Sequence, residues 1–390
     1  MDRLTRRGVL HWVIALCVAG WPVRGAAGQD HYVLGTTFGT THRVYRISAS
    51  GEVSIHQELN AGHRVEDIAV DRGGRFVWMI KGGGPSPIYR ISREFHLSLG
   101  GQVTASSPEW KVWRPALLTP DTSDLIVTAL APTTGDFRVS LEYSSLSNSL
   151  ATSAVHAVWD VSDIPEAQPQ VGVVSPFDRY TLFTDSGVIH LDPTALEFAL
   201  PQQASGYSRG FPAAGFDGRV ICTVSHADPG PEFGVNVVQG DGQGTVLLSD
   251  SIPDIPGVSN RHGAVVHPGG RFAYLYGLGG LPTIEVNPAS GLIQGVLETA
   301  PAPSTNAAAI SPDGTMFFLA TNRFNGIASM IPYRVNADGT LTQLNAGLQV
   351  PFSTADLEFL PPKTPPSLPG DANVDGLVDA ADVVTVVEMV

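Results

Sequence analysis

Six copies of one hairpin pattern recur along this 390-residue chain and limit the folds that it can form. In the clearest copy, residues 307–322, an apolar run leads into a Pro-Asp-Gly turn and a second apolar run follows. Proline presets φ for such a turn, and glycine accepts the positive φ that the turn often needs, so the pattern predicts two antiparallel strands. The other copies are 67–80, 116–129, 171–184, 210–224 and 264–276, and their turns are 39 to 57 residues apart. Strand-rich repeats of this length indicate the blades of a β-propeller.

The two ends of the chain supply the parts of one more blade. Residues 42–48 and 52–59 alternate apolar and polar side chains but lack a leading hairpin. Residues 356–361 resemble the first strand of a repeat, and no second strand follows them. Pairing them with the N-terminal strands would complete a blade and leave no exposed sheet edge. We therefore predict an all-β fold, a seven-bladed β-propeller over residues 30–361 that is closed by its C-terminal strand.

The N-terminus has the features of an export signal, which we assign to residues 1–28. Three arginines precede an apolar run at 9–23, and small residues at 25–28 form a cleavage zone. Residues 5–10, Thr-Arg-Arg-Gly-Val-Leu, resemble a twin-arginine signal, although an ordinary secretory signal also fits. We expect a periplasmic or extracellular protein with no membrane attachment after cleavage. The formal net charge of −14 argues against nucleic-acid binding, for which a basic face is expected.

A separate module is predicted after a proline-rich linker at 362–369. Residues 370–390 contain oxygen-bearing side chains at the spacing of an EF-hand loop, followed by the start of an apolar helix. The predicted calcium ligands are Asp371, Asn373, Asp375, the Leu377 carbonyl, Asp379 and Asp382. The pattern resembles a dockerin repeat, which implies a cohesin-like partner, but one repeat is present where dockerins have two. The alternative interpretation is an acidic tail.

The residues just before each innermost strand are predicted to surround one mouth of the central channel. Counting back seven and eight residues from each turn gives His63 and Arg64, Trp113 and Arg114, Gln170 and Val171, Arg209 and Gly210, Arg261 and His262, and Thr305 and Asn306. Four arginines and two histidines in an acidic protein suit a small anionic ligand, because guanidinium groups bind carboxylates in a forked geometry. Alternatively, these arginines pair with nearby carboxylates such as Glu66 and Asp67.

Residues 260–361 resemble the seven-bladed lactonase family, whose best-known members are 6-phosphogluconolactonases. Residues 261–274 resemble the Pro-Arg-His blade start of that family, with Asn260 in place of the proline, and 309–361 resemble its last blade. The earlier blades do not carry the resemblance. It implies a propeller and a lactone-hydrolysing site at Arg261 and His262, where His262 would be the general base for water.

Two functions therefore remain open. The first is a secreted binding or scaffold propeller with a calcium-binding, dockerin-like C-terminal module; its ligand residues would be His63, Arg64, Arg114, Arg209 and Asn306. The second is an exported lactonase-like hydrolase that acts on a sugar lactone at the channel, with Arg261 and His262 as the catalytic residues. The residues alone do not decide whether the protein is an enzyme.

Overall fold

A computed structural model of the protein describes the propeller region. The described backbone comprises residues 30–37, 39–65, 67–70, 74–81, 85–104, 111–118, 124–132, 137–146, 152–160, 169–174, 180–184, 188–192, 197–202, 210–214, 220–226, 233–240, 246–252, 261–277, 280–287, 290, 292–321, 327–351 and 354–362. Side chains are described only within 30–104 and 263–362. The predicted export signal, the linker beyond Pro362 and the calcium module lie outside these residues. In the described part of the chain no helix has the length and hydrophobicity of a membrane span.

The strands of the described residues form seven antiparallel sheets. The closing sheet contains β29 (Thr354–Leu360), β1 (His31–Thr37), β2 (Thr41–Ile47) and β3 (Val53–Asn60), in that order. The next two sheets are β4 (Asp67–Val70), β5 (Phe76–Ile80), β6 (Ser86–Ile91) and β7 (Leu97–Val103), then β8 (Lys111–Leu118), β9 (Asp124–Pro132), β10 (Phe137–Leu146) and β11 (Thr152–Asp160). These are followed by β12 (Pro169–Val174), β13 (Tyr180–Thr184), β14 (Val188–Asp192) and β15 (Glu197–Gln202), then by β16 (Gly210–Ala214), β17 (Val220–His226), β18 (Phe233–Gly240) and β19 (Val246–Ile252). The last two are β20 (Arg261–Val266), β21 (Phe272–Gly277), β22 (Leu281–Val286) and β23 (Ile293–Ala300), and then β24 (Thr305–Ile310), β25 (Met316–Thr321), β26 (Ala328–Val335) and β27 (Leu341–Gln343), with β28 (Leu348–Val350) also paired to β26.

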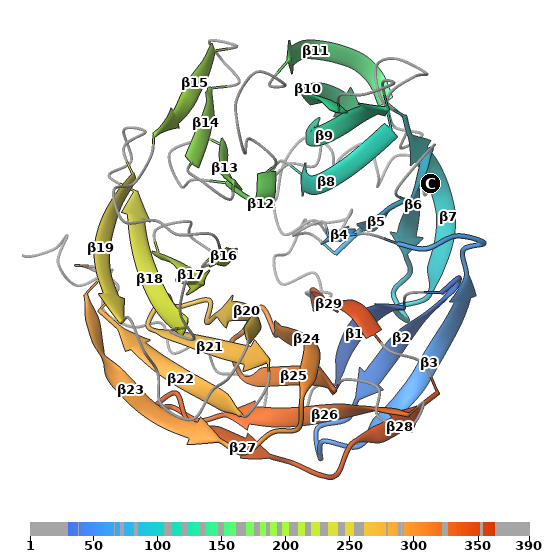
Figure 1. The fold of residues 1–390 in the computed structure, drawn as a ribbon. Coiled ribbons are helices and arrows are strands. Elements are labelled where there is room, and N and C mark those ends of the chain that lie inside the picture. The colour runs from blue at the N-terminus through green and yellow to red at the C-terminus, as the bar shows by residue number, and fades with distance from the viewer. Residues whose placement is uncertain are drawn as a thin grey trace, which may run out of the picture.

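The sheets are arranged around a common centre, as Figure 1 shows, with β4, β8, β12, β16, β20, β24 and β29 innermost. Each innermost strand contacts the next one in this order, and β29 contacts both β24 and β4, so the contacts run around the whole ring. All described secondary structure is β-strand. The fold is a β-propeller, which confirms the predicted fold class at this level.

The ring is closed by the strand that the sequence predicts. β29 pairs with β1 from Tyr32–Leu360 to Thr37–Thr354, with one register shift near the end. The closing sheet therefore combines the C-terminal strand with three N-terminal strands, and it exposes no inner edge at the junction. Leu357 and Phe359 point from β29 into a core cluster with Val33, Tyr45 and Phe318.

In the sheets whose side chains are described, the second strand is buried on both of its faces, which explains the long apolar runs. All six residues of β25 are buried, and its two phenylalanines lie in different cores. Phe318 packs against the closing sheet, whereas Phe317 packs with Tyr274 and Tyr333 on the other side. Successive strand residues point to opposite faces, so a sheet between two neighbours needs apolar side chains at every position.

The repeated turn is fixed by its own polar groups. In the copy at 311–316, Asp313 accepts hydrogen bonds from the Ser311 hydroxyl at 2.5 Å and from the Thr315 amide at 3.0 Å. Gly314 has a φ of 71°, and the His267 ring from the preceding sheet occupies the space that a Cβ there would need. His267 is a turn residue, as its place in the repeat predicts, and its Nδ1 accepts the Gly269 amide at 3.0 Å.

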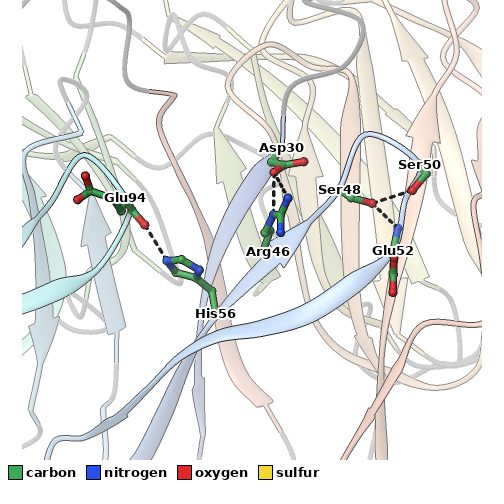
Figure 2. A network of polar contacts seen from close by, with 7 residues as sticks. All are labelled: Asp30, Arg46, Ser48, Ser50, Glu52, His56 and Glu94. Carbon is green, nitrogen blue, oxygen red and sulfur yellow. Dashed lines mark hydrogen bonds and ion pairs between the residues drawn. The ribbon is translucent and has the colours of Figure 1, made fainter.

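The outer hairpin turns join neighbouring sheets on the same end of the ring. Ser48 and Ser50 hold the β2–β3 turn, and the His56 ring donates to the Glu94 carbonyl in the next sheet at 2.7 Å (Figure 2). The β6–β7 turn has Phe95 at a φ of 61°, where the β2–β3 turn has Gly51. The Phe95 ring stacks on Tyr32 with 4.0 Å between ring centroids. This contact across the two sheets offsets part of the cost of positive φ in a bulky residue.

Closure by β29 makes a direct stability prediction. Leu357 is 2% exposed in the junction core, whereas Leu99 on the outer strand β7 is 61% exposed. We expect Leu357→Ala to lower the free energy of unfolding by about 2–5 kcal/mol, because it leaves a cavity. Leu99→Ala removes the same atoms from the surface and should change it by less than about 0.5 kcal/mol. Urea denaturation of both variants checks this, and equal effects would contradict the closure.

Candidate functional site at the mouth end of the ring

The hairpin turns gather at one end of the ring, and the innermost strands begin at the other, which we call the mouth end. The turn before β25 contacts His267 in the turn before β21, and Gly74, just before β5, contacts Pro361, just after β29. The starts of β4, β20, β24 and β29 therefore share the opposite end. These starts follow the positions from which the sequence predicts a binding mouth.

Four innermost strands share a one-residue bulge at their starts. The pairing skips Gln170 in β12, His262 in β20, Asn306 in β24 and Ala355 in β29. In β8 the pairing is interrupted between Val112 and Ala116, a stretch that contains Arg114. Bulges release a residue from the ladder and redirect it, and they are frequent beside active sites. Three of the four skipped residues are ones that the sequence predicts at the mouth.

The segment before β4 is anchored by a buried histidine. His42 is fully buried, and its Nδ1 accepts the Thr37 amide at 3.3 Å, because an amide can only donate. Its Nε2–H therefore donates to the His63 carbonyl at 3.2 Å. This arrangement requires a neutral imidazole. The hydrogen bond from His42 holds the backbone of His63 in place. It therefore helps to position the predicted ligand residues His63 and Arg64 at the mouth end.

The His63 side chain is half-buried at this position. Its Nε2 is buried and has no hydrogen-bond partner among the described residues, while the neighbouring Arg64 is exposed. Burial lowers the pKa of His63, a hydrogen bond to the Ala61 backbone works against this, and the charge of Lys81 lowers it further. A neutral His63 with an unused ring nitrogen can bind a ligand hydroxyl or accept a proton.

Two further polar groups at the mouth end are missing from the sequence-based prediction. Directly after the bulge, the first paired positions are Gly263 with Tyr276, Ala307 with Ala320, and Asp356 with Thr36. Asp356 and Tyr276 thus belong to the same layer of the ring. Counting back from turns cannot find Asp356, because no hairpin turn follows the closing strand. Tyr276 lies on the second strand of its sheet, outside the positions considered.

The structure places the predicted residues to different extents. His63, Arg64 and Asn306 are described at the mouth end, and the backbones of Arg261 and His262 begin β20 there. Arg114 is part of β8, where only the backbone is described. Arg209 lies outside the described residues, one position before the first residue of β16 in the sequence. The predicted calcium ligands from Asp371 to Asp382 are also outside them. Within the described residues, no group of three or more His, Cys, Asp or Glu side chains is arranged to hold a metal.

No family model and no curated protein matches the sequence. Solved structures match over most of the chain. The periplasmic gluconolactonase of Pseudomonas aeruginosa has 18% identity and a TM-score of 0.63, over 85% of this chain and 99% of that one. A Bacteroides fragilis protein, provisionally assigned as a 6-phosphogluconolactonase, has 12% identity and a TM-score of 0.61, over 87% and 99%. The oligogalacturonate lyase of Vibrio parahaemolyticus has 10% identity and a TM-score of 0.52, over 80% and 92%.

These similarities concern the fold of the chain. The chain has a β-propeller fold like that of gluconolactonase-type propellers, as its last blades indicate in sequence. At such low identity the likeness concerns the fold. A lyase on a related fold illustrates that a propeller hosts several chemistries, so function has to be argued from the residues of the mouth.

The neutral state of His42 predicts a pH dependence of stability. Burial lowers the pKa of His42 from its ordinary value of 6.5, although its bond to the His63 carbonyl opposes the shift. The unfolded chain therefore binds more protons than the folded chain below about pH 6.5, and the free energy of unfolding falls as the pH is lowered. His31, His63 and His267, whose pKa values burial also lowers, act in the same direction. We expect His42→Gln to lose less stability between pH 7.5 and 5.5 than the wild type, as measured by urea denaturation. An unchanged pH dependence would contradict the assignment.

Proposed function

We propose that the protein is an exported, seven-bladed β-propeller that binds a small anionic, hydroxyl-bearing ligand at the mouth end. The observation that carries the proposal is the bulge shared by β12, β20, β24 and β29, because it releases residues from four ladders at one end of the ring. The released positions include His262 and Asn306, and Arg261 precedes one of them. Arginine and histidine beside a released backbone suit a carboxylate or a lactone oxygen.

The overall charge makes this local composition more informative. The chain has a formal net charge of −14, yet four arginines occur near the starts of innermost strands. Arg64 and Arg209 precede β4 and β16, Arg261 begins β20, and Arg114 is the fourth residue of β8. A local positive potential in an acidic protein attracts small anions to this end of the ring. Asp356 adds a carboxylate to the same end, which suits a ligand that carries hydroxyl groups as well as a negative charge.

Lactone hydrolysis at Arg261 and His262 is the second candidate. It is favoured by the position of His262 at a bulge and by the fold likeness to a periplasmic gluconolactonase. His262 would remove a proton from water as the water oxygen attacks the lactone carbonyl, and Arg261 would stabilise the developing oxyanion. Collapse of the intermediate breaks the ring C–O bond, and the leaving alkoxide takes the proton from His262.

The C-terminal module completes the proposal. Residues 370–390 would bind calcium through Asp371, Asn373, Asp375, the Leu377 carbonyl, Asp379 and Asp382, and would attach the propeller to a cohesin-like partner. The predicted N-terminal signal would direct the protein to the periplasm or outside the cell, where extracellular modules commonly bind calcium with dissociation constants of about 0.1–1 mM. The module would therefore localise the propeller, and the mouth would bind the ligand.

The mouth is tested with gluconate and glucono-1,5-lactone. We expect calorimetry to detect gluconate binding to the wild type, and Arg261→Ala to weaken it by at least tenfold, because a charge-assisted hydrogen bond is lost. Arg271→Ala is the matched control, since Arg271 is exposed at the turn end and pairs with Glu285 at 2.7 Å. Lactone turnover that disappears in both Arg261→Ala and His262→Ala would favour the hydrolase. No binding and no turnover by the wild type would refute both candidates.

Calcium binding is tested separately on the full chain. We expect one calcium ion per chain by calorimetry, and no binding by Asp371→Ala, because the first ligand of the loop is removed. Magnesium, which demands a smaller octahedral site, should bind much more weakly. Identical calcium titrations of the wild type and the variant would remove the claim and leave the acidic-tail interpretation.

A further inference from the structure

Tyr276 holds its hydroxyl group at the innermost strand of the ring. It lies near the end of β21 and pairs directly with Gly263 of β20. Its hydroxyl oxygen occupies the space into which a Cβ at Gly263 would project. The ring therefore lies across the backbone of β20, from the second strand toward the centre. Gly263 follows the His262 bulge, so the hydroxyl lies beside a position that is already assigned to the mouth.

Two other tyrosines of the same core differ from Tyr276 in the position of their hydroxyl groups. Tyr274 and Tyr333 pack in the cluster that includes Phe317 and that Tyr276 borders. Both are buried, and within the described part of the chain their hydroxyl oxygens have no hydrogen-bond partner, so they contribute to the core as apolar rings. Tyr276 is instead half-buried, and it is the next-to-last residue of β21, at the mouth end of that strand.

Asp356 lies in the same layer, two sheets further around the ring. The sheet between them contributes Ala307 and Ala320 to this layer, so neither side chain there is bulky. Burial raises the pKa of the Tyr276 hydroxyl, and the charge of Asp356 raises it further. Tyr276 is consequently protonated at neutral pH and can donate a hydrogen bond, whereas the Asp356 carboxylate can only accept.

We propose that Tyr276 contacts the ligand at the mouth and donates a hydrogen bond to one of its oxygens, while Asp356 accepts hydrogen bonds from the hydroxyl groups of the same ligand. This inference rests on the proposed function and adds two ligand contacts to it. The arginines at the strand starts bind the acid group, and Tyr276 with Asp356 bind the hydroxylated chain. The site would then discriminate a hydroxylated acid from a plain fatty acid of the same length.

The experiment compares gluconate with hexanoate, which has the same number of carbons and no hydroxyl groups. Binding of each is measured by calorimetry on the wild type, Tyr276→Phe, Asp356→Asn and the control Tyr274→Phe. We expect the wild type to prefer gluconate, and Tyr276→Phe to weaken gluconate binding about tenfold without affecting hexanoate. Asp356→Asn should act in the same direction. Tyr274→Phe should bind both ligands as the wild type does, because its hydroxyl has no partner.

Thermal denaturation separates a ligand contact from a structural role. Tyr276→Phe keeps the ring over Gly263 and should unfold at the wild-type temperature. If it binds gluconate as well as the wild type, the inference fails and the proposed function stands. If it unfolds earlier and weakens both ligands equally, Tyr276 is a structural residue and the inference also fails. If the wild type binds neither acid, the proposed function fails first, and this inference fails with it.

Discussion

The pairing of β29 with β1 is the interaction on which the rest of the structure depends. It joins residues from opposite ends of the chain and completes the closing sheet. Without this pairing, the closing sheet would lack its innermost strand. Leu357 and Phe359 would then no longer pack with Tyr45 in the same core cluster. The same ladder carries the bulge at Ala355 and places Asp356 beside Thr36. The same pairing therefore closes the ring and positions residues at the mouth end.

The two ends of the ring differ in how their polar groups are used. At the turn end, polar groups are used to hold neighbouring sheets together: His267 lies against Gly314, and Gln57 exchanges two hydrogen bonds with the Leu97 backbone. Phe95 has an unfavourable positive φ there, and its stacking on Tyr32 offsets part of the cost. At the mouth end, ladders are interrupted by bulges, and the buried His63 Nε2 has no hydrogen-bond partner in the part of the chain that the structure describes. A ligand can use groups that the fold has left without a role in its own stability.

Much of the fold follows from the sequence because each repeat carries its own turn chemistry. Ser311, Asp313 and Gly314 specify a hairpin locally, and the apolar run of β25 specifies a sheet that is buried on both faces. The closing strand is also predictable, since 356–361 is an inner strand without a partner. What the sequence does not reveal is set by pairing between distant segments. Asp356 and Tyr276 enter the mouth only through their registers with Thr36 and Gly263, and no local pattern encodes a register.

The central claim is that ligand binding is confined to the mouth end, and a nuclear magnetic resonance titration with gluconate tests it most directly. We predict that amide signals of Asn306, Asp356 and Tyr276 shift in a saturable way, because these residues lie at the bulged strand starts or in the layer next to them. Signals of Gly51, Gly314 and Gly339 at the turn end should stay in place. Shifts at the turn end with an unchanged mouth would contradict the account.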